Sequence, residues 1–243
     1  MDVAWIGHAA FRLRGRDTAV VMDPAPSSTG FRLNRPQADI VTISNPDPSY
    51  SWVKGVGGGP IQLDAPGEYE IQNVLVTGVT DTPEHPKRSP DAEHQDHNDG
   101  DRENADAPPE LPPTATPFIP SGNIAFIVTI DDLVIAHLGD MRTPPRGEAL
   151  EELGRADVML VPIGGHGHMD ANMAATLVAA IAPKIVIPML YQAGSETETL
   201  DPVAPFLKAV GGAMPDELDN HINITRSALP NNTTVHVLAP RGE

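Results

Sequence analysis

The chain has 243 residues, of which 40% are hydrophobic, and this is enough for one large domain with a substantial core. Its 33 acidic and 16 basic residues leave a net charge of −17, which opposes binding to nucleic acid or to an anionic membrane. The absence of cysteine excludes disulfides, thiolate metal ligands and a cysteine nucleophile.

The N-terminal residues lack the basic and long apolar regions of a signal peptide. The longest apolar tract, residues 171–190, is interrupted by Pro183, Lys184 and Pro188, so we interpret it as a helix followed by a strand. We therefore expect a soluble, cytoplasmic protein without membrane or nucleic-acid partners.

Short apolar runs rich in β-branched residues occupy the first third of the sequence and predict strands. The expected strands cover residues 3–9, 11–14, 18–22, 40–43, 61–63, 68–71 and 74–79. Residues 45–50 contain two prolines and small polar side chains, which indicates a loop at a strand end. Such loops usually carry the functional groups of layered α/β folds. His8, after the first run, is interpreted as a hydrogen-bonded structural residue rather than a ligand.

Residues 81–120 differ in composition from the rest of the chain. They include ten acidic and three basic residues, a net charge of −7, together with nine prolines. Such a segment buries too little apolar surface to offset its ordering entropy, so we predict a mobile, acidic, proline-rich loop inserted into a single domain, 1–243. The segment contains His85, His94 and His97, and could be either a loose metal-binding tract or a solvated linker. We favour the linker, because no regular structure holds a pair of ligands in place.

Strands and helices alternate in the second half of the sequence. Strands are expected at 123–130, 133–138, 157–163, 184–190, 222–229 and 234–238, and helices at 147–154, 170–181 and 202–210. Asp170 is expected to cap the second helix, and Gly211 to close the third. A strand-rich first half followed by alternating helix and strand predicts an α/β (α+β) fold with two sheets covered by helices.

Eight short segments, taken together, form a recognisable series. They are WIGHAAF, VMDP, ADIVTIS, APGEYEI, VLVTGV, IAHLGD, LVPIGG and IVIPMLY, beginning at residues 5, 21, 38, 65, 74, 135, 160 and 185. In this order they resemble the metallo-β-lactamase fold, and specifically its branch of small metal-dependent (Zn) hydrolases. The resemblance covers most of the chain outside residues 81–120. It implies a four-layer αββα sandwich of two mixed sheets flanked by helices, with a metal site at the mouth between the sheets.

In that family, the loop after ADIVTIS carries the metal-binding motif His-x-His-x-Asp-His. The same register places other residues at the four positions, namely Asn45, Asp47, Ser49 and Tyr50. Asn and Ser are poor zinc ligands, and Tyr is a weak one at neutral pH. The family's last histidine falls at Leu190, whereas its bridging carboxylate is kept as Asp140. The family's middle histidine falls where the chain enters 81–120, and His85 is the nearest histidine there.

Two functions are compatible with this pattern. In the first, the protein has lost most of its dinuclear metal site, needs no metal cofactor, and acts as a binding or structural protein (a pseudoenzyme) or in a homo-oligomer. In the alternative, it is a metal-dependent hydrolase whose rebuilt site holds one Zn, Mn or Fe ion through Asp47, Asp140, His166 and His168. For His166 and His168, solvent-exposed histidines on a glycine loop are the favoured interpretation. Metal-free hydrolysis lacks an evident Ser-His-Asp arrangement.

The resemblance also predicts what replaces the metal. Leu190 stands in place of an imidazole, and Tyr50 and Trp52 are close by on the loop after ADIVTIS. We predict that these three side chains pack into the space that a metal centre would occupy. A mouth filled in this way is dry, and its stability does not depend on a metal.

Overall fold

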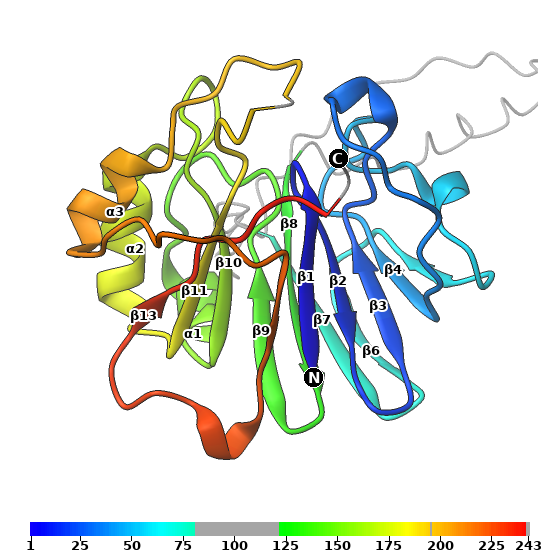
Figure 1. The fold of residues 1–243 in the computed structure, drawn as a ribbon. Coiled ribbons are helices and arrows are strands. Elements are labelled where there is room, and N and C mark those ends of the chain that lie inside the picture. The colour runs from blue at the N-terminus through cyan, green and yellow to red at the C-terminus, as the bar shows by residue number, and fades with distance from the viewer. Residues whose placement is uncertain (81–121, 195, 242–243) are drawn as a thin grey trace, which may run out of the picture. The chain divides into compact units, whose positions relative to one another are not determined.

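The computed structural model describes residues 1–80, 122–194 and 196–241 (Figure 1). The chain on either side of the predicted insertion, Met1–Asp81 and Gly122–Glu243, belongs to one structural unit. The insertion itself, predicted at 81–120 with His85, His94 and His97, lies outside the described residues.

The first sheet is mixed and has six strands. They are β1 (Asp2–Gly7), β2 (Ala10–Arg14), β3 (Ala19–Met22), β4 (Ile40–Thr42), β5 (Ile61–Leu63) and β12 (His221–Asn223). Their order across the sheet is β12-β1-β2-β3-β4-β5 (Figure 1). The pairs from β12 to β3 are antiparallel, and the pairs β3–β4 and β4–β5 are parallel.

The second sheet is also mixed and has seven strands. They are β6 (Gly67–Ile71), β7 (Val74–Thr80), β8 (Ile124–Ile130), β9 (Leu133–His137), β10 (Val158–Pro162), β11 (Ile185–Met189) and β13 (Thr234–Val235). Their order is β13-β11-β10-β9-β8-β7-β6. Strands β6 to β9 pair antiparallel, whereas β9, β10, β11 and β13 are parallel.

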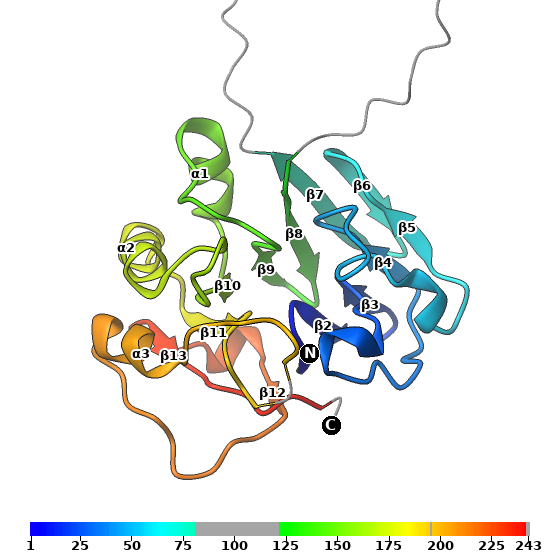
Figure 2. The same ribbon diagram turned by 90° about the horizontal axis from the view of Figure 1, so that it is seen from above.

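Three α-helices lie against the second sheet (Figure 2): α1 (Gly147–Leu153), α2 (Ala171–Ile181) and α3 (Ala204–Val210). As predicted, α2 begins after Asp170, whose carboxylate accepts hydrogen bonds from the backbone N–H groups of Asn172 and Met173. Short 3-10 helices also form: η1 (Ser27–Thr29), η2 (Val53–Gly55) and η3 (Arg226–Ala228). The predicted strand 222–229 is wrong in its second half, because β12 ends at Asn223 and η3 follows.

Strands β3 and β4 show how the first sheet is covered on both faces. Successive strand residues point to opposite faces, so Val20 and Ile40 join the main core whereas Val21 and Val41 join a second cluster. The second cluster includes Val56, which directly follows η2, so the loop that contains η2 covers the outer face. The predicted fold, two mixed sheets in an α/β sandwich with helices, is therefore confirmed.

No helix in the described ranges combines the length and the apolar character that a membrane crossing requires.

Candidate functional site

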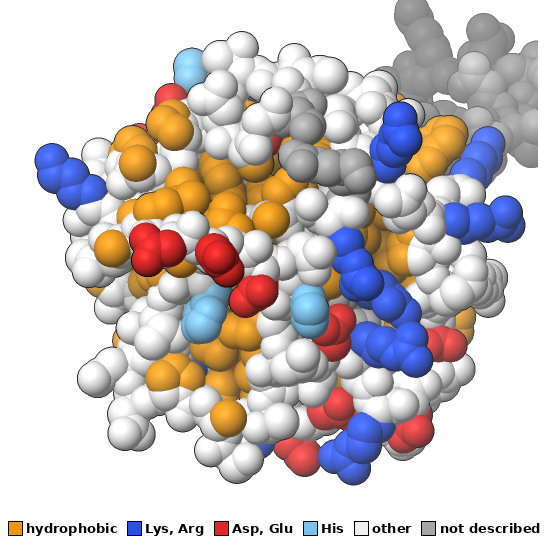
Figure 3. Space-filling view, viewed as in Figure 1, with side chains coloured by type: hydrophobic (Ala, Val, Ile, Leu, Met, Phe, Trp, Pro, Cys, Tyr) orange, Lys and Arg blue, Asp and Glu red, His pale blue; other side chains and the backbone are white. Residues whose placement is uncertain are grey.

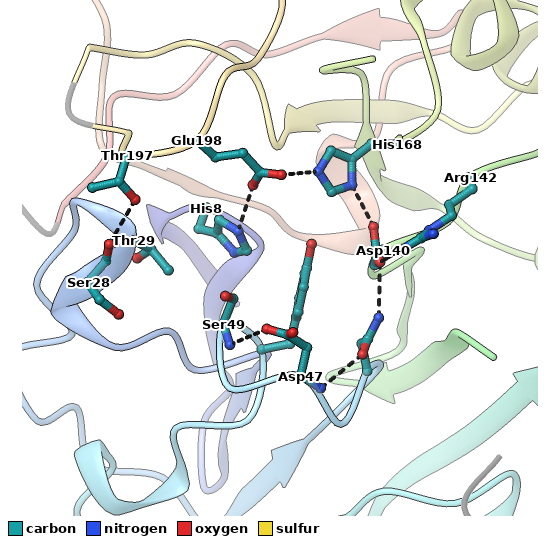
Figure 4. Close-up of a pocket in the computed structure, with 12 residues that line it drawn as sticks. His8, Ser28, Thr29, Asp47, Ser49, Asp140, Arg142, His168, Thr197 and Glu198 are labelled. Atoms are coloured by element: carbon teal, nitrogen blue, oxygen red, sulfur yellow. Dashed lines mark hydrogen bonds and ion pairs between the residues drawn. The ribbon is translucent and has the colours of Figure 1, made fainter. Parts of the chain in front are cut away.

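A pocket of about 410 Å³ opens where strands of both sheets end. Strands β1, β3 and β4 run in one direction, as the antiparallel pairs of β2 require, and β9, β10 and β11 are parallel to one another. The loops that follow these six strands therefore meet at one edge. Twelve residues from these loops line the pocket (Figure 4): His8, Ser28, Thr29, Asn45, Asp47, Ser49, Tyr50, Asp140, Arg142, His168, Thr197 and Glu198.

The structure brings most of the predicted site residues to this pocket. All four residues of the altered motif line it, as do Asp140, after β9, and His168, after β10. His166 does not, because its side chain is half exposed and its Nε2 lies 3.3 Å from an Asp201 carboxylate oxygen. The two histidines of the glycine loop were expected to be exposed to solvent. His166 is exposed as expected, but His168 is not, because its side chain is only 7% exposed.

The predicted filling of the mouth is wrong for two of its three residues. Tyr50 lines the pocket and is buried. Trp52 is 44% exposed and lines a different pocket. Leu190 is fully buried within the main core and does not line the pocket. The mouth is therefore an open polar pocket rather than a dry contact between apolar side chains.

Both carboxylate oxygens of Asp140 accept hydrogen bonds from neighbouring side chains (Figure 4). Oδ2 accepts from Asn45 Nδ2 at 3.0 Å and from Arg142 Nη2 at 3.2 Å, and Oδ1 lies 2.5 Å from His168 Nδ1. The side chain of Asp140 is 3% exposed. Three of the roughly four lone-pair positions of this carboxylate are therefore engaged by the protein's own donors.

His168 connects Asp140 to Glu198. Its Nε2 lies 3.1 Å from one Glu198 carboxylate oxygen, and the other oxygen lies 3.8 Å from Nε2 of His8 (Figure 4). Burial lowers the pKa of His168, but its hydrogen bonds and charge interactions with Asp140 and Glu198 outweigh burial, and the pKa is raised. Hydrogen bonds and charge interactions with His8, and also with His168, lower the pKa of Glu198 to about 2. An imidazolium between two carboxylates is the expected state near neutral pH.

Two buried ionisable groups lie behind the pocket. Ser44 donates to Asp23 from its backbone N–H at 2.7 Å and from its hydroxyl at 2.5 Å. His137 accepts from the N–H of Gly139, so its Nε2 carries the proton and donates to the carbonyl of Ala9 at 2.8 Å. Burial raises the pKa of Asp23 to about 7 and lowers that of His137 to about 4. The bonds of Asp23 join the starts of the loops after β3 and β4, and the bond from His137 joins the end of β9 to Ala9, just after β1.

The residues present do not fit a dinuclear zinc centre. Such a centre needs several imidazole and carboxylate donors with free lone pairs, but an amide, Asn45, and a guanidinium, Arg142, face the retained Asp140. The Arg142 guanidinium, 3.2 Å from that carboxylate, also repels a divalent ion. Within the described part of the chain, no group of three or more His, Asp or Glu side chains has the arrangement to hold a metal ion.

Sequence reasoning missed several residues of the pocket. His8 was interpreted as structural, and Arg142, Thr197 and Glu198 were not singled out, although all four line the pocket. His8 and Arg142 closely follow strand ends, and this position was the available signal. Glu198 lies well beyond the end of β11, so only the folded loop brings it to the pocket.

Comparisons with known proteins agree on the fold and the family. A family model described as a β-lactamase superfamily domain matches residues 2–190. A UPF0173 metal-dependent hydrolase of Pelotomaculum thermopropionicum is 28% identical over 231 residues, covering 90% of this chain and 95% of its own. A UPF0173 protein of Pyrococcus furiosus is 27% identical over 209 residues, covering 82% and 87%.

Solved structures show the same architecture. A metallo-β-lactamase superfamily protein of Thermotoga maritima superposes with a TM-score of 0.68 at 24% identity, covering 98% of each chain. The metallo hydrolase Igni18 of Ignicoccus hospitalis superposes with a TM-score of 0.58 at 17% identity, covering 100% of this chain and 96% of its own. At these identities the superpositions establish the fold.

Proposed function

This chain belongs to the metallo-β-lactamase-fold family of metal-dependent hydrolases, and from that premise we propose that it has lost the dinuclear metal site and binds a small polar ligand in the pocket without metal. The observation that carries the proposal is that three donors, from Asn45, Arg142 and His168, already contact Asp140. A metal ion bound by both carboxylate oxygens would have to displace some of these donors.

The lining of the pocket supports a binding role. Arg142 offers the N–H donors that its contact with Asp140 leaves free, whereas Asp47 and Glu198 offer acceptors. Hydroxyl groups of Ser28, Ser49, Thr29 and Thr197 add groups that serve as either. Convergent polar groups in a concave site fix the orientation of a small molecule, and this pocket suits a ligand that carries both donors and acceptors.

One observation favours a second candidate, a hydrolase with a single-metal site. Asp47, Asp140 and His168 line one pocket, so three of the four residues of the predicted rebuilt site are near one another. His166 is absent from that set and pairs with Asp201 instead.

Metal analysis distinguishes the two candidates. We expect the purified protein to hold less than one transition-metal ion per chain, to melt at the same temperature with and without a chelator, and to hydrolyse phosphodiester, lactam and thioester substrates no faster than buffer. Two tightly bound ions per chain, or turnover that a chelator abolishes, would contradict the loss of the site.

The rebuilt-site candidate makes a different prediction. One ion per chain would be found, and it would be lost in Asp140→Ala and in His168→Ala. His166→Ala is the matched control, because it removes an imidazole from the same glycine loop but outside the pocket. Retention of the ion in this control would assign it to the pocket.

A further inference from the structure

A second pocket, also of about 410 Å³, is lined by segments near η1 and η2. Its described lining residues come from two segments of the chain: Ala25, Ser27, Arg32, Leu33, Asn34 and Arg35, and then Trp52, Lys54 and Gly55. It shares no described lining residue with the first pocket. Loss or retention of the metal site therefore has no bearing on it.

The second pocket is basic in a protein that is strongly acidic. Three of the 16 basic residues of the chain, Arg32, Arg35 and Lys54, line it, and no acidic side chain is among the described lining residues. All three are exposed. Figure 3 shows Lys and Arg side chains gathered on the side of this face where β3 and β4 lie in Figure 1. The local field therefore favours an anion, against the net charge of −17.

An exposed indole stands beside these cations. The side chain of Trp52 is 44% exposed, whereas the other tryptophan, Trp5, is fully buried. The indole of Trp52 packs closely over Gly55: a Cβ at residue 55 would lie only 2.5 Å from Cδ1 and 2.7 Å from Nε1 of Trp52. The same Cβ would lie 2.7 Å from the side chain of Leu33. The indole thus packs beside Gly55 and is 44% exposed, so a ligand can contact it.

The backbone places the two arginines at the same pocket. Asn34 and Arg35 have φ values of 53° and 48°, in the left-handed region that residues other than glycine seldom adopt. These two residues lie between Arg32 and the chain that follows Arg35, and both arginines line the pocket.

We propose that this pocket binds a nucleotide, with the base stacked on Trp52 and the phosphates held by Arg32, Arg35 and Lys54. Guanidinium groups bind phosphate oxygens in pairs of hydrogen bonds, and an aromatic ring stacks on any base. The volume of about 410 Å³ is in the range of small-molecule sites. A free nucleotide is favoured over a long nucleic acid, because a net charge of −17 repels a polyanion that extends beyond the pocket.

Isothermal titration calorimetry tests the proposal, with ATP, AMP, inorganic phosphate and adenosine as separate probes. We expect ATP to bind more tightly than AMP, and both to bind more tightly than phosphate or adenosine alone. Trp52→Ala should raise the Kd for ATP by about tenfold or more, and Trp52→Phe should restore part of the affinity because a ring remains. Tryptophan fluorescence provides a second readout, since Trp52 is the exposed tryptophan of the two.

Charge variants complete the test. Lys54→Gln and Arg32→Gln should weaken ATP binding and reduce its salt dependence, whereas Lys208→Gln, the same change on α3, should do neither. Thermal melting verifies that each variant is folded. Equal binding of ATP and inorganic phosphate, or an unchanged Kd for ATP in Trp52→Ala, would overturn the proposal, and so would tighter binding of an acidic peptide than of ATP.

Discussion

Asp23 is a carboxylic acid that lies fully buried beneath the first pocket, with a pKa raised by burial from 3.8 to about 7. Between these pH values the folded protein keeps a proton on Asp23 that the unfolded chain has released. The free energy of unfolding contributed by Asp23 is therefore fully present below about pH 4 and is lost as pH rises through about 7. His137, whose pKa is lowered to about 4, has the opposite dependence, because the unfolded chain binds its proton first.

Replacing Asp23 with Asn isolates this contribution. The amide has the same shape and keeps partners for both groups of Ser44, but it does not ionise. From about pH 4 to 7, we expect the stability of Asp23→Asn relative to wild type to rise by roughly 2–4 kcal/mol and to stay constant above that range. Urea unfolding of both proteins across this range measures the difference. A difference that does not vary with pH would show that Asp23 ionises as it does in water.

His168 should report on its two carboxylate neighbours. Because Asp140 and Glu198 raise its pKa, the charged form stabilises the fold fully below the ordinary pKa of about 6.5, and this contribution is lost as pH rises through the raised value. In Asp140→Asn or Glu198→Gln we expect the pKa of His168 to fall, since a neutral amide removes one attracting charge. NMR titration of the imidazole signals measures the change, and His166, which lies outside this pocket, is the internal control. An unchanged His168 titration would mean that the contacts of Figure 4 do not persist in solution.

Single residues show how far the site could be anticipated from the sequence. The resemblance to the family put Asp140 and the altered motif on loops at one sheet edge, and these residues line one pocket. His166 and His168 could not be separated in this way, since one glycine turn directs the first toward Asp201 and the second toward Asp140. Whether a side chain on such a turn points inward depends on left-handed dihedral angles, such as the φ of 50° at His166, which the sequence pattern does not reveal.

Among the elements, β10 and β11 show how the strand ends are packed behind the pocket. Leu190, just after β11, has a φ of 50° and is fully buried. Its carbonyl oxygen would lie 2.0 Å from a Cβ on Gly164, just after β10. Only a glycine fits at residue 164, because the atom in the way belongs to backbone. The loops after these two strands are therefore in direct contact, and the Leu190 side chain is part of the main core.

Leu190→Ala should be strongly destabilising for this reason. Removing a buried leucine side chain from a packed core costs roughly 2–5 kcal/mol. If the metal site is lost as proposed, a chelator should leave the melting temperature of both wild type and variant unchanged. Leu218→Ala is the matched control, since Leu218 is 38% exposed and its loss should cost little. A neutral effect at Leu190 would mean that the core closes around the missing side chain.

The elements also show how far a pattern predicts a fold. The amphipathic stretch after Asp170 and the hairpin of β8 and β9 were predicted closely, because local signals determine both. The pairing of β12 with β1 joins opposite ends of the chain, and no local signal specifies it. Residues 226–228 were included in the predicted strand 222–229, but they are Arg, Ser and Ala and form η3.

For the whole molecule, charge is distributed unevenly. The net charge of −17 repels polyanions at long range, and yet the described lining of the pocket beside Trp52 has three cations and no acidic side chain. The pocket at the strand ends instead combines Arg142 and His168 with three carboxylates, those of Asp47, Asp140 and Glu198. The two pockets therefore differ in the sign of the charge that they favour.

The register of β7 and β8 has a consequence for the length of the chain between them. Thr80 faces Ile124 in this antiparallel pair, so residues 81–123 join two positions that are already neighbours.

Deleting 81–120 would leave Ser121-Gly122-Asn123 as a three-residue hairpin loop of a common type that contains a glycine. The entropic cost of closing the shorter loop would be smaller by roughly 2 kcal/mol. The net charge would change from −17 to −10, since the segment carries −7. We expect the shortened protein to fold and to melt at a higher temperature than the full chain, as calorimetry would measure, and a lower melting temperature would show that the deleted segment stabilises the fold. If the result is as expected, the connection between β7 and β8 tolerates insertions and deletions of very different length without a change in either sheet.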